Sequence, residues 1–298
     1  MAAVDVFSGE AREYQLQRTA TRRAGTSLIA ELPVYLFLAV MAVLMAAPVL
    51  WMVLSSLKTE HEVSAIPPIW FPQEGLQFQN FTRVIEITPL GTAYVNSLII
   101  GATVTVIQVL SSALAGYAFA KLRFKGREPL FIGVLSTMML PGFLIQIPLF
   151  VVVQRLGWLN TFWPMIVPFL FTPFGIFMMR QFMLNIPNEY IDSARLDGAG
   201  EIGLIYQIVF PLIREAAAAL AIFVFISNWD QLFWPLLVLR QKPMYTLPLA
   251  LYSIQGDMGT YYHLILAGAT MAIVPPLVVY FFLQDKIVQG ITLTGLKG

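Results

Sequence analysis

The chain has 298 residues, of which 58% are hydrophobic and only 12% are charged, whereas a soluble domain usually carries about 25% charged residues. This composition excludes an ordinary soluble protein, and the formal net charge of +1 offers no electrostatic basis for binding nucleic acid. Because the sequence contains no cysteine, disulfide bonds, thiolate metal sites and a cysteine nucleophile are excluded as well.

Six long apolar stretches follow one another along the chain. Five of them, residues 32–57, 87–120, 129–154, 156–179 and 258–284, contain no Asp, Glu, Lys or Arg, and the sixth, 216–239, is interrupted only by Asp230. A helix needs about 20 mostly apolar residues to cross the ~30 Å hydrocarbon layer, and it satisfies its own backbone groups there. We therefore predict an all-α integral membrane protein with six transmembrane helices. The predicted spans are residues 33–57, 94–120, 130–154, 161–184, 214–239 and 263–285.

These spans divide the chain into segments on the two sides of the membrane. The predicted segments are a cytoplasmic tail at 1–31, a first transmembrane helix at 32–57, an external loop at 58–93, a transmembrane domain at 94–285 and a cytoplasmic tail at 286–298. The external loop contains Pro67, Pro68 and Trp70. These residue types favour an extended stretch with an aromatic anchor at the membrane interface.

The basic residues indicate the orientation of the spans. If the N-terminus is cytoplasmic, 13 of the 18 Lys and Arg residues lie inside and 5 lie outside, as the positive-inside rule requires. Both termini are therefore predicted to be cytoplasmic, which an odd number of spans would not allow. The inner loop 121–127 is short and strongly basic, and its simplest role is to anchor this topology.

The longest inner loop, residues 185–214, has the pattern of two short helices joined by a glycine. Pro187 suits the first turn of a helix, and Asp192 and Arg195 are three residues apart, so they can pair on one helix face. Gly198 is placed to end this helix in a left-handed cap. By its shape alone, the loop could also be an amphipathic helix that lies on lipid.

The spacing within this loop resembles the signature of permease subunits of binding-protein-dependent ABC importers. That signature is Glu-Ala-Ala, three residues, Gly, nine residues and then Ile-x-Leu-Pro. Here Asp192-Ser193-Ala194, Gly198 and Ile208-Val209-Phe210-Pro211 fall at the same offsets. The three departures are Asp for Glu, Ser for the first Ala and Phe for Leu, and each keeps the charge sign, the small size or the apolar bulk.

The resemblance implies a type I ABC importer permease fold, in which this loop is the coupling helix that docks into a cleft of a separate ATPase subunit. The coupling residues that it implies are Glu189, Asp192, Ser193, Ala194, Asp197, Gly198, Ile208 and Pro211. It also implies a second permease subunit in a heterodimer, two ATPase subunits and an external solute-binding protein, in a bacterial or archaeal cytoplasmic membrane. ATP and Mg²⁺ would be bound by the ATPase subunits, because this chain has no phosphate-binding loop.

Other segments are similar to carbohydrate-uptake permeases of the maltose type, in the shorter, six-span partner of an unlike pair. They are Ser56-Leu57-Lys58, Pro67-Pro68, Trp70-Phe71-Pro72, Asn80-Phe81, Asn228-Trp229-Asp230 and Trp234-Pro235-Leu236. The C-terminal tail is also similar, which implies that Gly295, Lys297 and Gly298 contact the ATPase; a tail without function is the alternative. The implied function is the import of a sugar or a related solute by alternating access.

Polar residues within the spans are candidates for the substrate path. Asp230 is the one carboxylate within the six apolar stretches, and an ionisable group there usually faces a cavity or a partner. Asn228, Trp229, Asp230 and Gln231 are therefore candidate substrate contacts, although hydrogen bonding between helices would explain them equally well. Weaker candidates, for which hydrogen bonding between helices is the preferred interpretation, are Gln108, Ser111, Ser112, Gln146 and Gln154.

Enzymatic and metal sites are not expected in this chain. No nucleophile and base are suitably spaced, and His61 and His263 have no ligand-spaced partner. The main alternative function is an ion-coupled secondary transporter of a small solute, which should carry charges on several spans and leaves the loop 185–214 unexplained. A membrane-embedded enzyme is a second alternative, which should show a catalytic constellation.

Overall fold

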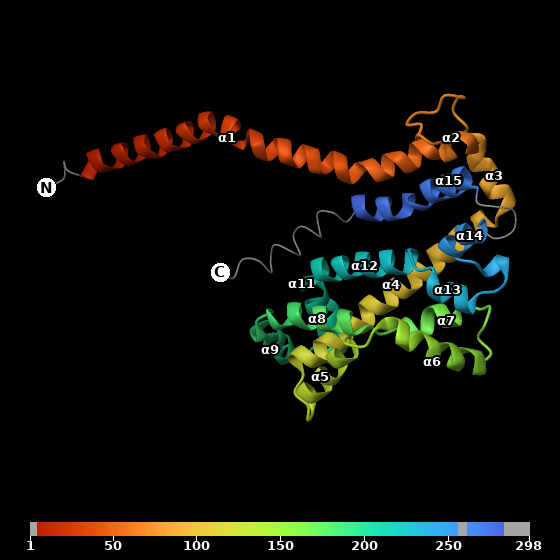
Figure 1. The fold of residues 1–298 in the computed structure, drawn as a ribbon. Coiled ribbons are helices and arrows are strands. Elements are labelled where there is room, and N and C mark those ends of the chain that lie inside the picture. Colours follow the sequence, from red (N-terminus) through yellow and green to blue (C-terminus); the bar gives the residue numbers. More distant parts are fainter. Residues whose placement is uncertain (1–4, 256–260, 283–298) are drawn as a thin grey trace. The chain divides into compact units, whose positions relative to one another are not determined.

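A computed structural model describes residues 5–255 and 261–282, and every regular element in these residues is helical (Figure 1). The predicted all-α fold is therefore confirmed. Contacts along the chain divide it into two units, Met1–Leu54 and Ser55–Gly298.

Helix α1 (Asp5–Ser56) has 52 residues and makes up nearly all of the described part of the first unit. Its segment Glu31–Ser56 is long and apolar enough to cross a membrane. The helix begins within the polar tail and continues through Pro33 and Pro48 without a break. The predicted tail and the first predicted span thus share one helix.

Four helices in the described residues could each cross a membrane by their length and composition. They are Glu31–Ser56, Leu90–Lys121, Trp163–Leu184 and Tyr262–Phe282. Two further pairs meet the same criteria only when they are taken together: Arg127–Thr137 with Gly142–Arg155, bent by 94°, and Glu201–Leu212 with Arg214–Trp229, bent by 82°. The count is six when each bent pair is taken as one span, although the second pair includes residues 201–212, which the sequence analysis assigns to an inner loop.

Several spans that the sequence predicts as continuous are interrupted in the structure. The predicted span 130–154 is divided between α5 (Arg127–Thr137) and α6 (Gly142–Arg155), with Pro141 at the start of α6. The predicted span 214–239 is divided between α12 (Arg214–Trp229) and α13 (Phe233–Val238). Proline disfavours helical backbone at the residue before it and cannot donate a helical hydrogen bond, so Pro141 at the start of α6 accounts for the first break. Pro235 lies in the first turn of α13, where proline is tolerated, and it does not explain the second break.

The centre of the second unit is formed by α4 (Leu90–Lys121), α8 (Pro173–Leu184) and α12, which pack against one another. Their buried side chains include Val104, Ala113 and Tyr117 of α4, Met179 and Met183 of α8, and Leu220 of α12. The remaining short helices are α2 (Glu60–Ser64), α3 (Gln79–Ile87), α7 (Trp163–Ile166), η1 (Val167–Phe169), η3 (Lys242–Met244), α14 (Leu247–Ser253) and α15 (Tyr262–Ala272).

The contact between α4 and α8 is unusually close at Gly116. A Cβ atom at this position would lie 2.7 Å from the Cβ of Met179 and 2.9 Å from the backbone nitrogen of Arg180. Glycine is therefore required here, because small residues let two helix backbones approach each other.

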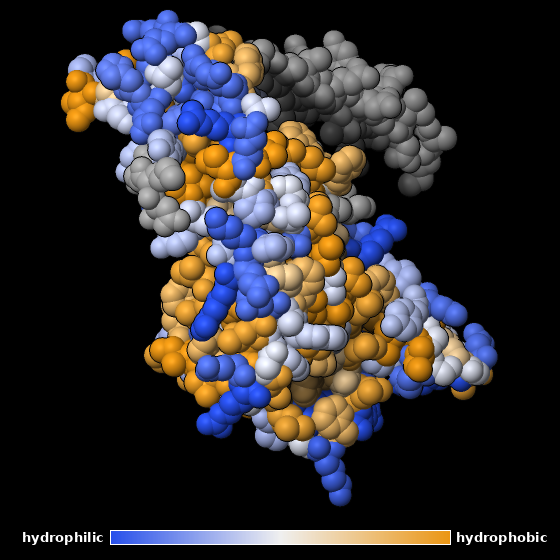
Figure 2. Space-filling view, turned by 90° about the vertical axis from the view of Figure 1, so that its right-hand side faces the viewer, coloured by the Kyte–Doolittle hydropathy of each residue, from blue (hydrophilic) through white to orange (hydrophobic). Residues whose placement is uncertain are grey.

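Much of the outer surface of the second unit is apolar. Side chains such as Val95 and Val106 on α4 and Ile132 on α5 are exposed, and Figure 2 shows hydrophobic residues over much of the visible face. Apolar surface of this extent needs lipid or a protein partner to cover it.

The segment after the first span is held by side chains that bind backbone groups. Lys58 is buried, and its Nζ donates to the carbonyl oxygen of Ile69 at 2.6 Å. The Nδ2 of Asn80 donates to the carbonyl oxygens of Ser56 and Lys58, each at 2.9 Å. Between these anchors, residues 65–78 contain no helix, as expected for the proline-rich stretch.

Glu62 is the second anchor of this loop. Its carboxylate is buried and accepts the backbone N–H groups of Gln73, Glu74 and Thr59, the last two at 3.0 Å. Burial acts to raise the pKa of Glu62, but the backbone donors outweigh it, and the pKa lies below its ordinary value. The carboxylate therefore stabilises the loop above the ordinary pKa of a glutamate, and this stabilisation is lost as the pH falls through the depressed pKa.

We expect Glu62→Gln to increase hydrogen–deuterium exchange at Gln73 and Glu74 severalfold at neutral pH, because an amide cannot replace the charge. Acidification should also increase exchange of the wild-type loop, after correction for intrinsic rates, and it should add little to the variant. Glu60→Gln is the matched control on the same helix. Equal protection in the wild type and in Glu62→Gln would contradict this role.

Candidate functional site

The loop 185–214 forms a bent arrangement of short helices, which we call the elbow. It consists of α9 (Asn188–Leu196), α10 (Glu201–Leu204), a π-helical turn (η2, Ile205–Val209) and α11 (Phe210–Leu212). The two-helix pattern expected from the sequence is therefore present, with the second stretch divided in three.

The elbow turns at Gly198, as predicted from the sequence. Gly198 has φ +86°, in the left-handed region. The N–H of Ala199 donates to the carbonyl oxygen of Ala194 at 3.0 Å, and the N–H of Gly198 donates to that of Arg195 at 3.1 Å. This pair of bonds is a Schellman motif, which ends α9 and satisfies its last carbonyl groups.

A cluster of three side chains, those of Arg195, Glu201 and Tyr117, links the helices of the elbow to α4. Arg195 donates to Glu201 Oε1 through Nη2 at 2.8 Å and through Nε at 3.0 Å. The hydroxyl group of Tyr117, on α4, donates to Glu201 Oε2 at 2.7 Å. Because Tyr117 is buried in the core, this cluster fixes the corner of the elbow to a transmembrane helix. The predicted pair of Asp192 and Arg195 is also present, at 3.6 Å.

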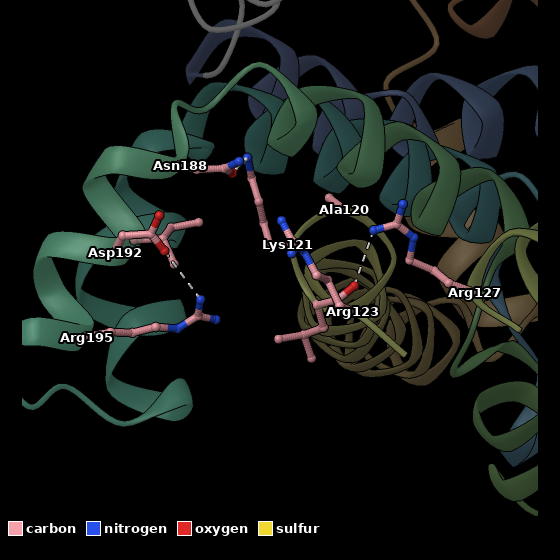
Figure 3. A pocket seen from close by; sticks show the side chains of 9 residues that line it. Ala120, Lys121, Arg123, Arg127, Asn188, Asp192 and Arg195 are labelled. Atoms are coloured by element: carbon pink, nitrogen blue, oxygen red, sulfur yellow. Dashed lines mark hydrogen bonds and ion pairs between the residues drawn. The ribbon is translucent and has the colours of Figure 1, made fainter. Parts of the chain in front are cut away.

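A cavity of about 610 Å³ lies between the elbow and the C-terminal end of α4 (Figure 3). Its lining residues are Ala120, Lys121, Leu122, Arg123, Arg127, Asn188, Ile191, Asp192 and Arg195. Lys121 connects the two walls, because its Nζ donates to the carbonyl oxygen of Ile186 at 2.6 Å and to Oδ1 of Asn188 at 2.9 Å. The basic inner loop thus supports the elbow in addition to its expected role in topology.

Two apolar side chains of the elbow that do not line this cavity are exposed. Leu196 is 89% exposed and Ile202 is 74% exposed. Of the coupling residues named from the sequence, Ala194 is buried, Ile208 is half-buried, and Glu189, Asp192, Ser193, Asp197, Gly198 and Pro211 are exposed. Exposed leucine and isoleucine side chains at a helix corner are suited to contact with another protein surface.

The candidate substrate residues at the end of α12 point in different directions. Asn228 and Gln231 line a second cavity, of about 430 Å³. Trp229 is buried elsewhere: its Nε1 donates to the carbonyl oxygen of Ala272 at 3.0 Å, and its ring stacks on Phe225. Asp230 is exposed and does not line the cavity.

Hydrogen bonding between segments accounts for two of the weaker polar candidates. Gln108 donates through Nε2 to the carbonyl oxygen of Phe169, and Ser111 donates through Oγ to that of Leu170 at 2.6 Å. These bonds join α4 to the end of η1, as the preferred interpretation of these residues expects.

Sequence reasoning missed Glu201 and Tyr117. Glu201 lies in the first turn of α10, six residues after Arg195, and this charge pattern could have indicated it. Nothing in the sequence pairs Tyr117 with the elbow, because 84 residues separate it from Glu201.

Among the described residues, no group of three or more His, Asp or Glu side chains could hold a metal ion. The candidate tail contacts Gly295, Lys297 and Gly298 lie outside the described residues.

Comparisons with known proteins agree on one class of protein, the membrane components of transport systems. Residues 109–293 match the family described as "Binding-protein-dependent transport system inner membrane component". The chain is 33% identical over 268 residues to the arabinooligosaccharides transport system permease protein AraQ of Bacillus subtilis (strain 168), covering 88% of this chain and 94% of the relative. It is 31% identical over 256 residues to the lactose transport system permease protein LacG of Rhizobium radiobacter, covering 86% and 93%.

A solved structure has a similar fold. The crystal structure of a bacterial ABC transporter involved in the import of the acidic polysaccharide alginate contains a chain that matches with a TM-score of 0.75. That chain is 21% identical, and the match covers 88% of this chain and 98% of that one.

Proposed function

Because the chain belongs to the family of inner membrane components of binding-protein-dependent transport systems, we propose that it is the permease subunit of an ABC importer for a sugar or a related solute. It is a multi-pass membrane protein and a transport component, not a catalytic subunit. The relatives named for arabinooligosaccharide and lactose transport support the cargo class.

The structure of the elbow is the observation that carries this proposal. It ends α9 in a glycine cap, binds α4 through Glu201 and Tyr117, and exposes Leu196 and Ile202. A corner that is fixed to a transmembrane helix and apolar at its tip is suited to transmit the movement of a docked protein. The proposed coupling residues are Glu189, Asp192, Ser193, Ala194, Asp197, Gly198, Ile208 and Pro211.

The proposed partners follow from this role. Two ATPase subunits bind ATP and Mg²⁺, and one of them docks on the elbow of this chain. A second, unlike permease subunit completes the pore, and an external solute-binding protein delivers the cargo in a bacterial or archaeal cytoplasmic membrane. Gly295, Lys297 and Gly298 are proposed to form a further contact with the ATPase.

The proposed mechanism is alternating access. When the ATPase subunits close on ATP, they move the elbow, and the elbow moves α4 through the cluster of Arg195, Glu201 and Tyr117. The cavity between the permease subunits then opens first to the outside and afterwards to the inside. The free energy comes from ATP, and the cargo needs only to bind the two states with different affinity.

Proteoliposomes test this function. The complete transporter, with its binding protein, should accumulate a radiolabelled neutral sugar such as lactose or an arabinooligosaccharide only when ATP and the ATPase subunits are present. A non-hydrolysable ATP analogue is the control. Accumulation without ATPase subunits, driven by an imposed proton or sodium gradient, would instead establish the ion-coupled carrier.

A further inference from the structure

The second cavity, which we call the α12 cavity, lies beside the end of α12 and within the transmembrane part of the chain. Its volume of about 430 Å³ is in the range of about 300–1,000 Å³ that is usual for small-molecule sites. The lining residues come from three segments far apart in the sequence: Gln108; Phe169, Thr172 and Phe174; and Phe223, Val224, Ser227, Asn228 and Gln231.

Gln231 contributes an unused hydrogen-bond acceptor. Its Oε1 is buried, and no group among the described residues donates to it. A buried acceptor without a donor is unfavourable, so rotation of the Gln231 carboxamide toward a hydroxyl group of a ligand in the cavity would be favourable. Gln231 follows the last turn of α12, where the helix has already ended at Trp229, and this break is what turns its side chain toward the cavity.

Asn228 and Ser227 add further polar groups beside Gln231. The Nδ2 of Asn228 donates to the carbonyl oxygen of Val224 at 2.9 Å, which fixes the amide and leaves its Oδ1 as an acceptor. A carboxamide accepts through oxygen and donates through nitrogen, and a hydroxyl group does both. Two amides and a hydroxyl on neighbouring positions therefore match adjacent hydroxyl groups of a ligand.

Aromatic rings form the apolar part of the same cavity. Phe174 and Phe223 are 42% and 52% exposed, and their rings meet edge to face with centroids 6.4 Å apart. Exposed ring faces next to a few polar groups are typical of sites that bind the carbon–hydrogen face of a ligand and orient its polar edge.

The lining contains no Asp, Glu, Lys, Arg or His. A charged ligand would leave its charge without a partner there, which is unfavourable at low dielectric. We propose that the α12 cavity is a binding site for the transported cargo, formed by this subunit itself, and that the cargo contains a neutral polyhydroxylated ring. This inference rests on the proposed function. Gln231 and Asn228 bind the hydroxyl groups of this ring, and Phe174 and Phe223 cover its apolar face.

The test uses Gln231→Leu in the complete transporter in proteoliposomes. Leucine removes both hydrogen-bonding groups at similar volume and also removes the unsatisfied buried oxygen, so the variant should fold at least as well as the wild type. Gln146→Leu is the matched control, because Gln146 on α6 also has a buried Oε1 without a donor but does not line this cavity.

The probes are radiolabelled lactose, an arabinooligosaccharide and glycerol 3-phosphate. For the neutral sugar that the wild type transports, Gln231→Leu should lower the uptake rate about tenfold. ATP hydrolysis stimulated by the binding protein should stay within about twofold of wild type, and Gln146→Leu should transport normally. Unchanged uptake in Gln231→Leu, an equal loss in Gln146→Leu, or wild-type preference for glycerol 3-phosphate would overturn the proposal. A wild type that transports no probe with ATP would overturn the proposed function instead.

Discussion

Gly198→Val is expected to abolish ATP-coupled transport while the protein still inserts into the membrane. Gly198 has φ +86°, and a residue with a Cβ atom costs about 1–2 kcal/mol in this region, more for a β-branched side chain. A Cβ atom there would meet no other atom within 4 Å, so the effect comes from the backbone and not from crowding. Without the Schellman motif, α9 continues or frays, and Leu196 no longer lies at the corner.

Two measurements separate this effect from misfolding. The amount of variant in the membrane fraction should equal that of wild type, whereas co-purification with the ATPase and uptake should each fall about tenfold or more. Gly198→Asn is the matched control, because asparagine tolerates left-handed backbone, and it should keep most of the activity. Normal transport by Gly198→Val would contradict the role of the elbow.

Gly116→Val is expected to destabilise the packing of α4 against α8. The new Cβ atom would lie 2.7 Å from the Cβ of Met179 and 2.9 Å from a backbone nitrogen. Backbone atoms cannot rotate away, so the two helices must separate. Overpacking of this kind typically costs about 1–3 kcal/mol, and we expect a lower melting temperature and a lower yield of purified protein in detergent.

Gly91→Val on the same helix is the control for this prediction. A Cβ atom at Gly91 would meet nothing within 4 Å, so the substitution changes helix propensity alone and should leave the melting temperature nearly unchanged. Equal destabilisation by the two variants would show that the loss arises within α4 and not at its contact with α8.

The sequence predicts those features that depend on local chemistry. Long apolar runs predict the helices, and the offset between Asp192 and Gly198 predicts both the family and the left-handed cap. The glycine acts through its own backbone angles, and the ion pair of Asp192 and Arg195 joins neighbouring turns of one helix. Neither feature needs knowledge of the tertiary fold.

Features that depend on distant parts of the chain could not be predicted in the same way. The apolar run around Asp230 suggests one continuous span, but the helix ends at Trp229, and this break sends Trp229 and Gln231 to opposite surroundings. Tyr117 is an ordinary aromatic residue of an apolar helix until the fold brings Glu201 to it. The direction of each polar side chain is thus decided by packing.

Helix α4 contributes residues to two separate sites, the elbow cluster and the α12 cavity. Tyr117, near its C-terminal end, donates a hydrogen bond to Glu201, and Gln108, nine residues earlier, lines the α12 cavity. At 1.5 Å per residue these positions are about 14 Å apart along a single continuous helix. Because α4 is a single helix without an internal proline, a tilt imposed at its C-terminal end would also displace the wall of the α12 cavity.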